Sequence, residues 1–166
     1  MSYIPTLKKK YTEVVVPALK AKYNYKSVMQ VPKLSKIVIN QGVGAAVGDK
    51  KLIDNSIDEI SRISGQKAVS TKSKKAISNF KLREGQAIGV KVTLRGLRMY
   101  EFLDRFFNIV CPRIRDFRGF PSKCDGKGNY TLGLTDQQVF PELNLDEVKR
   151  AQGMHITFVT SANTDE

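Results

Sequence analysis

Two nine-residue segments of this sequence alternate between aliphatic and polar side chains, which is the pattern of a half-buried β-strand. Residues 33–41 and 87–95 both follow it, with aliphatic groups on one face and polar or basic groups on the other. The segment 50–64 carries an isoleucine-rich stripe at helical spacing, with Asp49 placed to cap it and Gly65 to stop it. These patterns predict a sheet with helices on its aliphatic face only.

The remaining segments predict further helices and strands. Apolar residues at helical spacing predict helices over 6–22 and 97–110. Pro17 is expected to kink or restart the first helix, and Pro112 to end the second. Short strands are predicted at 67–71, 130–134, 137–140 and 154–161, and a short helix at 144–150. The sequence has no internal repeat and no linker, and its 166 residues are about the length of one domain.

The polar faces of the two long strands should stay open, because helices can cover only the aliphatic side. They carry Lys36 and Asn40 on the first strand, and Lys91, Thr93 and Arg95 on the second. An open polar sheet is one of the surfaces with which proteins bind RNA. An ordinary half-solvated sheet shows the same alternation, so this pattern alone leaves both interpretations open.

The segment between Lys67 and Arg83 contains six basic residues and no acidic one. Hydroxyl groups and one aromatic ring, Phe80, lie among these cations. Lysine and arginine neutralise phosphates, hydroxyls donate to phosphate oxygens, and a ring stacks on a base. Charge runs are often only solvated loops, but a surface built for solubility mixes both signs of charge. We therefore predict a nucleic-acid contact in this segment.

The whole chain is basic, with a formal net charge of +12 and a sequence pI near 9.8. An anionic partner offsets such self-repulsion, so nucleic acid is the first candidate and an anionic membrane surface the second. No apolar run approaches the ~20 residues that span a bilayer, and the first residues do not resemble a secretion signal. Cys111 and Cys124 lack metal-binding spacing. These features predict a cytoplasmic protein with reduced thiols.

Residues that could carry catalysis are scarce. The glycine turn at 42–48 has the spacing GxGxxxG instead of the dinucleotide fingerprint, and the next strand has no acidic residue to hold a ribose. His155 is the single histidine, which leaves little material for a metal site or a catalytic triad. We predict no catalytic residue, no metal and no cofactor. The alternatives are a nucleotide-dependent enzyme using the turn at 42–48 and Asp49, and a peripheral membrane protein.

Several longer segments together resemble one known family. They are residues 23–44, 63–96, 112–120, 125–133 and 139–142. The family is the bacterial large-ribosomal-subunit protein five, the 5S rRNA-binding protein, and the resemblance runs from about residue 7 to the end of the chain. It implies a single α+β domain over residues 1–166, with helices on one face of an antiparallel sheet. It also implies that a long basic loop, residues 72–85, projects from the sheet.

The resemblance implies a structural, non-catalytic part of the large ribosomal subunit in the cytoplasm. Family members bind 5S rRNA and large-subunit rRNA in the central protuberance. They contact the peptidyl-site tRNA through the basic loop. They also meet a small-subunit head protein across a bridge between the subunits.

The family's functional positions carry over onto particular residues of this chain. Its 5S rRNA-binding positions fall on Asn40, Gln66, Phe80 and Thr93. We expect Lys36, Lys91 and Arg95 to bind 5S rRNA as well, since they share the polar strand faces. The tRNA-contacting loop falls on Lys72, Lys74, Lys75, Ser78, Asn79, Lys81 and Arg83. The strand alternation places Asn40 and Thr93 on the polar faces independently of the resemblance.

Three features depart from the family pattern. Cys124 stands where an aromatic residue is usual, and Lys127 replaces an arginine, which removes a bidentate donor. The family also continues into a C-terminal helix beyond the position of residue 166. We therefore expect the packing near Asp125 and the covering of the last strand to differ from the family.

Overall fold

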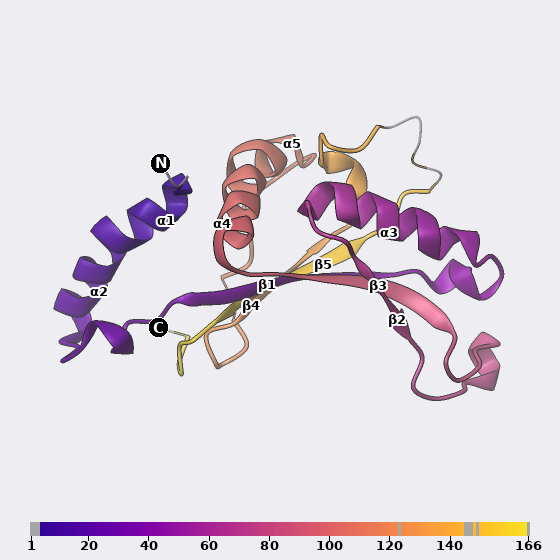
Figure 1. The fold of residues 1–166 in the computed structure, drawn as a ribbon, viewed down its shortest axis with the longest axis horizontal. Coiled ribbons are helices and arrows are strands. Elements are labelled where there is room, and N and C mark those ends of the chain that lie inside the picture. The colour runs from indigo at the N-terminus through magenta and orange to yellow at the C-terminus, as the bar shows by residue number, and fades with distance from the viewer. Residues whose placement is uncertain (1–3, 123, 145–147, 149, 166) are drawn as a thin grey trace. The chain divides into compact units, whose positions relative to one another are not determined.

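The strands form one five-stranded antiparallel sheet with the order β2-β3-β1-β5-β4 (Figure 1). The structure is a computed structural model that describes residues 4–122, 124–144, 148 and 150–165. The strands are β1 (Leu34–Gly42), β2 (Val69–Lys72), β3 (Ala87–Leu94), β4 (Tyr130–Leu134) and β5 (Met154–Thr160). The helices are α1 (Thr6–Lys10), α2 (Val16–Tyr23), α3 (Lys51–Ser64), α4 (Gly96–Arg105) and α5 (Cys111–Arg113). The predicted α+β class is confirmed.

Within this fold the chain forms two compact units. The first combines the residues up to Ile37, Arg95–Thr131 and the residues from Thr157 onward, and the second combines Val38–Leu94 with Leu132–Ile156. Strands β2 and β3 and helix α3 lie entirely in the second unit, whereas α1, α2, α4 and α5 lie in the first.

The predicted strand faces are confirmed in the second unit. Ile39 of β1 is buried, and so are Val90, Val92 and Leu94 of β3. Helix α3 packs against β3 on this side of the sheet (Figure 1), because its own isoleucines at helical spacing form a matching apolar stripe. The aliphatic side of the sheet is therefore the covered side.

The C-terminal end of α3 follows the sequence prediction, whereas the N-cap residue is Lys50 and not the predicted Asp49. The Asp49 carboxylate accepts a hydrogen bond of 2.9 Å from the backbone N–H of Lys51, which satisfies one of the free donors at the start of the helix. At the other end Gly65 adopts φ 66°, a left-handed conformation that glycine takes without a steric penalty. The sequence thus defines where this helix begins and ends.

The first unit contains two π-helical turns, and each lies just before a proline. Tyr11–Val15 precedes Pro17, and Phe106–Val110 precedes Pro112. Proline has no N–H, and its ring crowds the carbonyl four residues earlier, so the preceding turn widens. Pro17 restarts the first helix, as predicted. Pro112 lies inside the last helical turn, and the helix ends at Arg113, three residues beyond the predicted end at 110.

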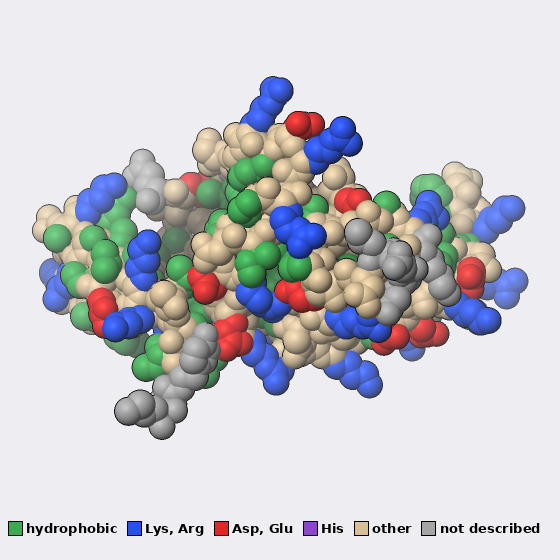
Figure 2. Space-filling model, turned by 90° about the horizontal axis from the view of Figure 1, so that it is seen from above, with side chains coloured by type: hydrophobic (Ala, Val, Ile, Leu, Met, Phe, Trp, Pro, Cys, Tyr) green, Lys and Arg blue, Asp and Glu red, His purple; other side chains and the backbone are tan. Residues whose placement is uncertain are grey.

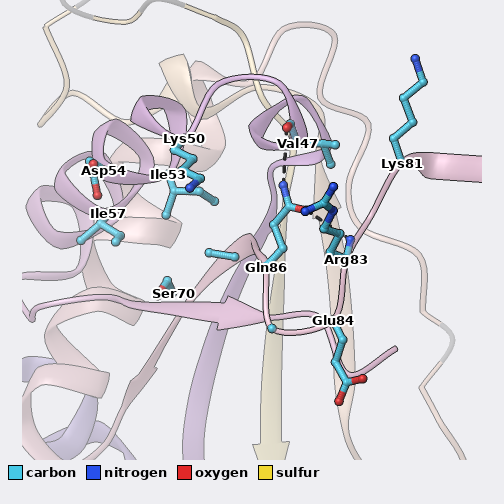
Figure 3. Close-up of a pocket in the computed structure, with 12 residues that line it drawn as sticks. Val47, Lys50, Ile53, Asp54, Ile57, Ser70, Lys81, Arg83, Glu84 and Gln86 are labelled. Atoms are coloured by element: carbon cyan, nitrogen blue, oxygen red, sulfur yellow. Dashed lines mark hydrogen bonds between the residues drawn. The ribbon is translucent and has the colours of Figure 1, made fainter. Parts of the chain in front are cut away.

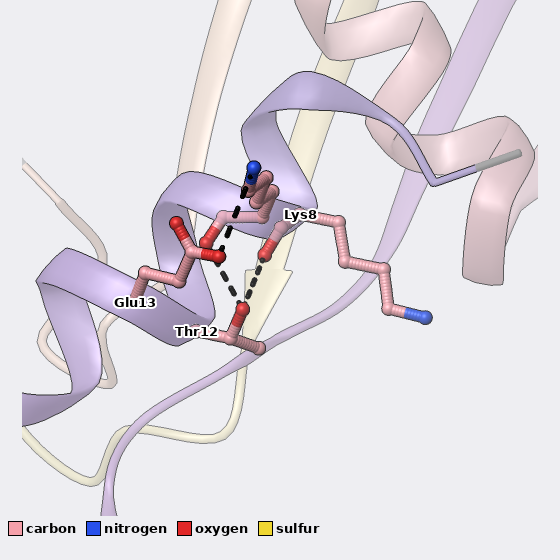
Figure 4. A network of polar contacts seen from close by, with 4 residues as sticks. Lys8, Thr12 and Glu13 are labelled. Carbon is pink, nitrogen blue, oxygen red and sulfur yellow. Dashed lines mark hydrogen bonds and ion pairs between the residues drawn. The ribbon is translucent and has the colours of Figure 1, made fainter.

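A local polar network accompanies the first of these π turns (Figure 4). The Thr12 hydroxyl donates to the carbonyl oxygens of Lys8, at 3.2 Å, and Lys9, at 2.9 Å. The Lys9 ammonium lies 4.0 Å from the Glu13 carboxylate. Threonine hydroxyls that bond back to the preceding turn often bend helices, so Thr12 assists the irregularity that Pro17 imposes.

The core of the first unit is an aromatic cluster around Phe106. This ring is fully buried, and the ring centroids of Phe102 and Phe120 lie 6.0 Å from it. Phe158 of β5 adds a third ring at 6.3 Å. Such offset ring pairs stabilise a core beyond simple area burial. Phe106 therefore joins α4, the segment after α5 and β5.

Two sequence predictions fail or fall outside the described residues. Residues 137–140 were predicted as a strand, but Gln137–Val139 form a 3₁₀ turn, which the Asp136 side chain caps at 2.8 Å through the N–H of Gln138. A local side-chain bond of this kind competes with strand pairing. The short helix predicted at 144–150 rests on residues 145–147 and 149, which lie outside the described part of the chain.

Gln137 also connects the 3₁₀ turn to α3. Its amide nitrogen donates to the Arg150 carbonyl at 2.7 Å and to the Glu59 carboxylate at 3.3 Å, and its amide oxygen accepts from the N–H of Gln152 at 2.6 Å. Burial raises the pKa of Glu59, and the hydrogen bond from Gln137 and the charge of Arg62 oppose that shift. Gln137 is thus a buried amide with its hydrogen bonds satisfied.

Gln41 of β1 is a buried amide of the opposite kind. It is 0% exposed, and neither its oxygen nor its nitrogen has a hydrogen-bond partner among the described residues. An unpartnered buried amide costs roughly 1–3 kcal/mol. We expect Gln41→Met, which keeps a similar side-chain length, to raise the free energy of unfolding by about 1–2 kcal/mol in urea denaturation.

The matched control is Gln137→Met, which removes a buried amide whose hydrogen bonds are made. That variant should lose stability, because the Arg150 carbonyl and the Gln152 N–H would then be left without their partner. A loss of similar size for Gln41→Met would contradict the account of Gln41.

Candidate nucleic-acid interface

The side of the second unit opposite α3 is an open polar surface. Asn40 of β1 and Lys91 of β3 are exposed, and Thr93 is half-buried. Val69 of β2 pairs with Lys91 across the antiparallel ladder and is 60% exposed, so the surface extends to the strand at the edge of the sheet. We call Asn40, Gln66, Lys91 and Thr93 the polar sheet face.

Gln66 joins this face through a hydrogen bond to a residue 27 positions away. Its amide nitrogen donates to the Thr93 carbonyl at 3.2 Å. The Ser64 hydroxyl donates to the Gln66 carbonyl at 2.8 Å and accepts from the Gln66 N–H at 3.2 Å, directly after the left-handed Gly65. The end of α3 therefore places Gln66 beside β3.

A close approach of strands supports the same surface at Gly89. A Cβ atom at this position would lie 2.7 Å from the Thr71 hydroxyl oxygen and 3.0 Å from the Gln41 carbonyl oxygen. The carbonyl belongs to the backbone and cannot rotate away. Only glycine therefore fits between β2 and β1 at this point of β3.

The segment 72–85 continues the pairing of β2 and β3 past their ends, and we call it the hairpin end (Figure 1). Ser73 and Gln86 share a backbone hydrogen bond of 2.8 Å, and Ile77 and Leu82 exchange two, at 2.9 and 3.1 Å. A 3₁₀ turn at Ser78–Phe80 closes it, followed by Lys81 in a left-handed conformation with φ 52°. The segment has a defined backbone path.

The cations of the hairpin end are exposed and free of carboxylate partners. In the described part of the chain none of them forms an ion pair. Figure 2 shows Lys and Arg side chains gathered at the end of the second unit where this hairpin lies. The five cations of the hairpin end are Lys72, Lys74, Lys75, Lys81 and Arg83. Unpaired surface cations near one another are suited to a phosphate backbone.

The predicted site residues fall into separate groups. Asn40, Gln66 and Thr93 belong to the polar sheet face together with Lys91. Phe80 lies in the turn of the hairpin end with Ser78 and Asn79 and is 71% exposed, so it is not part of the strand surface. Lys36, which is half-buried, and Arg95, which is exposed, belong to the first unit.

Two exposed residues of the second unit were missed by the sequence analysis. Val69 lies opposite Lys91, and His155 of β5 is exposed between the buried Met154 and Ile156. The alternation of β5 could have identified His155, whereas β2 has no such alternation, and the aliphatic Val69 would have been expected on the buried side. Val69 adds an apolar contact beside Lys91.

The loop that contains two departures from the family is held by short polar contacts in the first unit. The Asp125 carboxylate accepts from the Asn129 amide at 2.7 Å and from the N–H groups of Lys127 and Asn129 at 2.8 and 3.0 Å. These bonds, that of the Asn129 side chain first, lower the pKa of Asp125. Cys124 beside it is half-buried and free.

The described residues offer little for other kinds of site. They contain no group of three or more metal-ligating side chains, and none of their helices is both long enough and apolar enough to cross a membrane. The strongest arrangement in the second unit is therefore the polar sheet face with the cationic hairpin end.

Comparison with known protein families gives two matches along the chain. Residues 27–83 match the family described as "Ribosomal protein L5", and residues 87–166 match the "ribosomal L5P family C-terminus". Together the two matched regions take up most of the sequence, including the polar sheet face and all of the hairpin end except its last residues.

Individual relatives are similar over nearly the whole chain. A protein of Protochlamydia amoebophila named "Large ribosomal subunit protein uL5" is 70% identical, over 96% of this chain and 86% of its own length. Proteins of the same name from Christiangramia forsetii and Parabacteroides distasonis are 60% and 61% identical, over 100% of this chain and 91% and 90% of their own. Identities of 60–70% over nearly the whole chain show that this chain and these proteins belong to one family.

The family consists of structural components of the ribosome and not of enzymes. This excludes the nucleotide-dependent enzyme that the glycine turn at 42–48 suggested as an alternative. In bacteria the ribosome is cytoplasmic, in agreement with the location predicted from the sequence. From its matches over residues 27–83 and 87–166 and its identity to these relatives, the chain belongs to the ribosomal protein L5 family.

Proposed function

We propose that this protein is a structural RNA-binding component of the large ribosomal subunit that binds 5S rRNA through its polar sheet face. The exposure of Asn40 and Lys91, beside the bonded pair Gln66 and Thr93, is the observation that carries this proposal. Amide and hydroxyl groups on an open sheet can bond to bases and to ribose 2′-hydroxyls, and the lysine neutralises a phosphate. Large-subunit rRNA in the central protuberance is the second RNA partner.

The hairpin end has a second role in this proposal, which is contact with the peptidyl-site tRNA. Its five cations have no carboxylate partner among the described residues, and Ser78 and Asn79 supply neutral hydrogen-bonding groups. The exposed ring of Phe80 lies in the same turn as Ser78 and Asn79. In this proposal the ring therefore stacks on a base of the RNA that contacts the hairpin end, and not on RNA bound to the polar sheet face. Lys36 and Arg95 extend 5S rRNA binding in the first unit.

A protein of the small-subunit head, across a bridge between the subunits, completes the proposed set of partners. This part of the proposal rests on the family resemblance and on no particular contact in the second unit. This contact with a small-subunit protein is tested in assembled ribosomes, with cross-linkers attached in turn to the first unit and to the second unit.

Two sets of variants should separate the two RNA contacts. Asn40→Ala should weaken 5S rRNA binding about five- to tenfold, since it removes hydrogen bonds from the polar sheet face. Lys74→Ala combined with Lys75→Ala should leave 5S rRNA binding within about twofold of the unmodified protein. The same double variant should weaken tRNA contact and lower its salt slope, the slope of log binding constant against log salt concentration, by about two. Filter binding with 5S rRNA and cross-linking to tRNA on reconstituted subunits measure both.

The control for Asn40→Ala is Asn163→Ala, which removes the same amide from an exposed position in the first unit. It should change neither readout. If the Asn40 and lysine variants instead lose 5S rRNA and tRNA contact to the same extent, the division of labour between sheet and hairpin is wrong.

A further inference from the structure

The second unit contains a groove of about 760 Å³ on the side where α3 lies (Figure 3). One wall is Lys50 with the first turns of α3, which carry Ile53 and Ile57. The other wall is Arg83 of the hairpin end together with Gln86, the residue that follows the hairpin end. Ser70 of β2 also lines it, whereas the neighbouring Val69 faces the opposite side beside Lys91. The groove and the polar sheet face are therefore on opposite sides of the hairpin.

The floor of this groove is apolar and its wall is held in place. Ile53 is buried and Ile57 half-buried, and the two side chains supply the aliphatic part of the lining. The Gln86 amide donates to the Val47 carbonyl at 3.4 Å and accepts from the Arg83 N–H at 3.3 Å. These bonds, drawn in Figure 3, tie the hairpin to the turn before α3, so the groove is largely formed without a ligand.

The rim of the groove is cationic. Lys50, Lys81 and Arg83 are exposed, and in the part of the chain that the structure describes none of them has an ion-pair partner. Two exposed acidic residues also line it. Asp54 lies on α3, on the far side of the groove from Arg83, and Figure 3 shows the Glu84 carboxylate directed away from Gln86 and Val47. The Arg83 side chain lies alongside Gln86 and so presents its planar guanidinium group at the wall (Figure 3).

We propose that this groove holds one unstacked nucleotide of the rRNA that the protein binds. The base lies on the aliphatic floor of Ile53 and Ile57 and against the guanidinium plane of Arg83. Its phosphates are neutralised by Lys50 and Lys81. Proteins read single-stranded RNA by splaying bases out against flat side chains, and the planar arginine guanidinium group is one of the surfaces on which such bases stack. This inference rests on the proposed function, because the nucleotide belongs to the same RNA.

The charge and the position of the groove favour RNA over other occupants. Three unpaired cations over an aliphatic floor match a ligand that is both anionic and flat. One wall is formed by the segment that carries the proposed tRNA contact, so an RNA strand can pass from the hairpin end into the groove without leaving the cationic surface. The hairpin would then be held by RNA on both of its sides.

The decisive comparison is Lys50→Glu with Lys51→Glu. These neighbours carry the same charge and are both exposed, but only Lys50 lines the groove. With 5S rRNA and large-subunit rRNA as probes, Lys50→Glu should weaken binding to one of the two at least about fivefold more than Lys51→Glu does. In nucleotide-resolution footprinting, a single nucleotide should lose protection in the Lys50→Glu variant only.

A photoreactive residue placed at position 50 in assembled large subunits identifies the occupant directly. Cross-linking to one rRNA nucleotide, with no such product from position 51, is the expected result. Cross-linking to a ribosomal protein would overturn the proposal, as would equal binding by the two glutamate variants. If the groove proposal is overturned in either way but Asn40→Ala still weakens 5S rRNA binding, only the groove proposal is wrong and the proposed function stands. If the unmodified protein binds no RNA, both the proposed function and the groove proposal are wrong.

Discussion

Phe106→Ala should lower the free energy of unfolding by about 4 kcal/mol, the largest stability loss expected from any single substitution considered for this protein. The ring is 0% exposed and has the rings of Phe102, Phe120 and Phe158 within 6.0 to 6.3 Å. Its removal leaves a cavity where α4 and β5 meet, and neighbouring rings cannot collapse fully into it. Guanidinium denaturation followed by circular dichroism measures the loss.

The control is the adjacent Phe107, whose ring lies 5.6 Å from that of Phe106 but is 47% exposed. Phe107→Ala should cost much less, about 1–2 kcal/mol, because about half of the removed surface is already in water. Equal losses for the two variants would mean that the aromatic cluster does not form the core of the first unit.

Removal of all five cations of the hairpin end should have the largest effect on RNA contact. We expect the combined alanine variant to weaken tRNA contact by on the order of a hundredfold at low salt and to reduce the salt slope by about four, since each phosphate contact contributes nearly one to it. The positions are Lys72, Lys74, Lys75, Lys81 and Arg83. A titration of binding against salt concentration gives both numbers.

A charge-matched variant separates local contact from the effect of net charge. It replaces five exposed lysines of the first unit by alanine: Lys8, Lys10, Lys20, Lys22 and Lys26. Both variants lower the formal net charge from +12 to about +7. If the two lose tRNA contact equally, then overall charge is responsible and the hairpin end has no special role.

Regular alternation made the strands the most predictable part of this fold. The strands predicted at 33–41, 87–95, 130–134 and 154–161 lie within one residue of β1, β3, β4 and β5 at each end. Burial follows a period of two because successive side chains point to opposite faces, and this property needs no knowledge of distant residues. Local chemistry likewise located the ends of α3 to within one residue, since Asp49 and Gly65 both lie next to the helix in the sequence.

Predictions failed where contacts between distant residues compete with a local pattern. Residues 137–140 read as a short strand, yet the buried Gln137 bonds to Arg150 and Gln152 and the segment turns instead of pairing. The apolar spacing of residues 6–22 correctly predicts a helix, but no residue of α1 or α2 is buried and Val14 is 58% exposed. Periodicity states which residues share a face and not whether anything covers it.

The sequence by itself determined the family, the excess of positive charge, the faces of the strands and the boundaries of α3. Each of these is either a count or a pattern among near neighbours, and such patterns survive without a folded structure. Only the tertiary structure decided that Gln66 bonds to Thr93, that Gln41 is buried without a partner and that α3 and the hairpin enclose a groove. These depend on packing between residues far apart in the chain, where burial and hydrogen bonding are set by three-dimensional neighbours that no local pattern encodes.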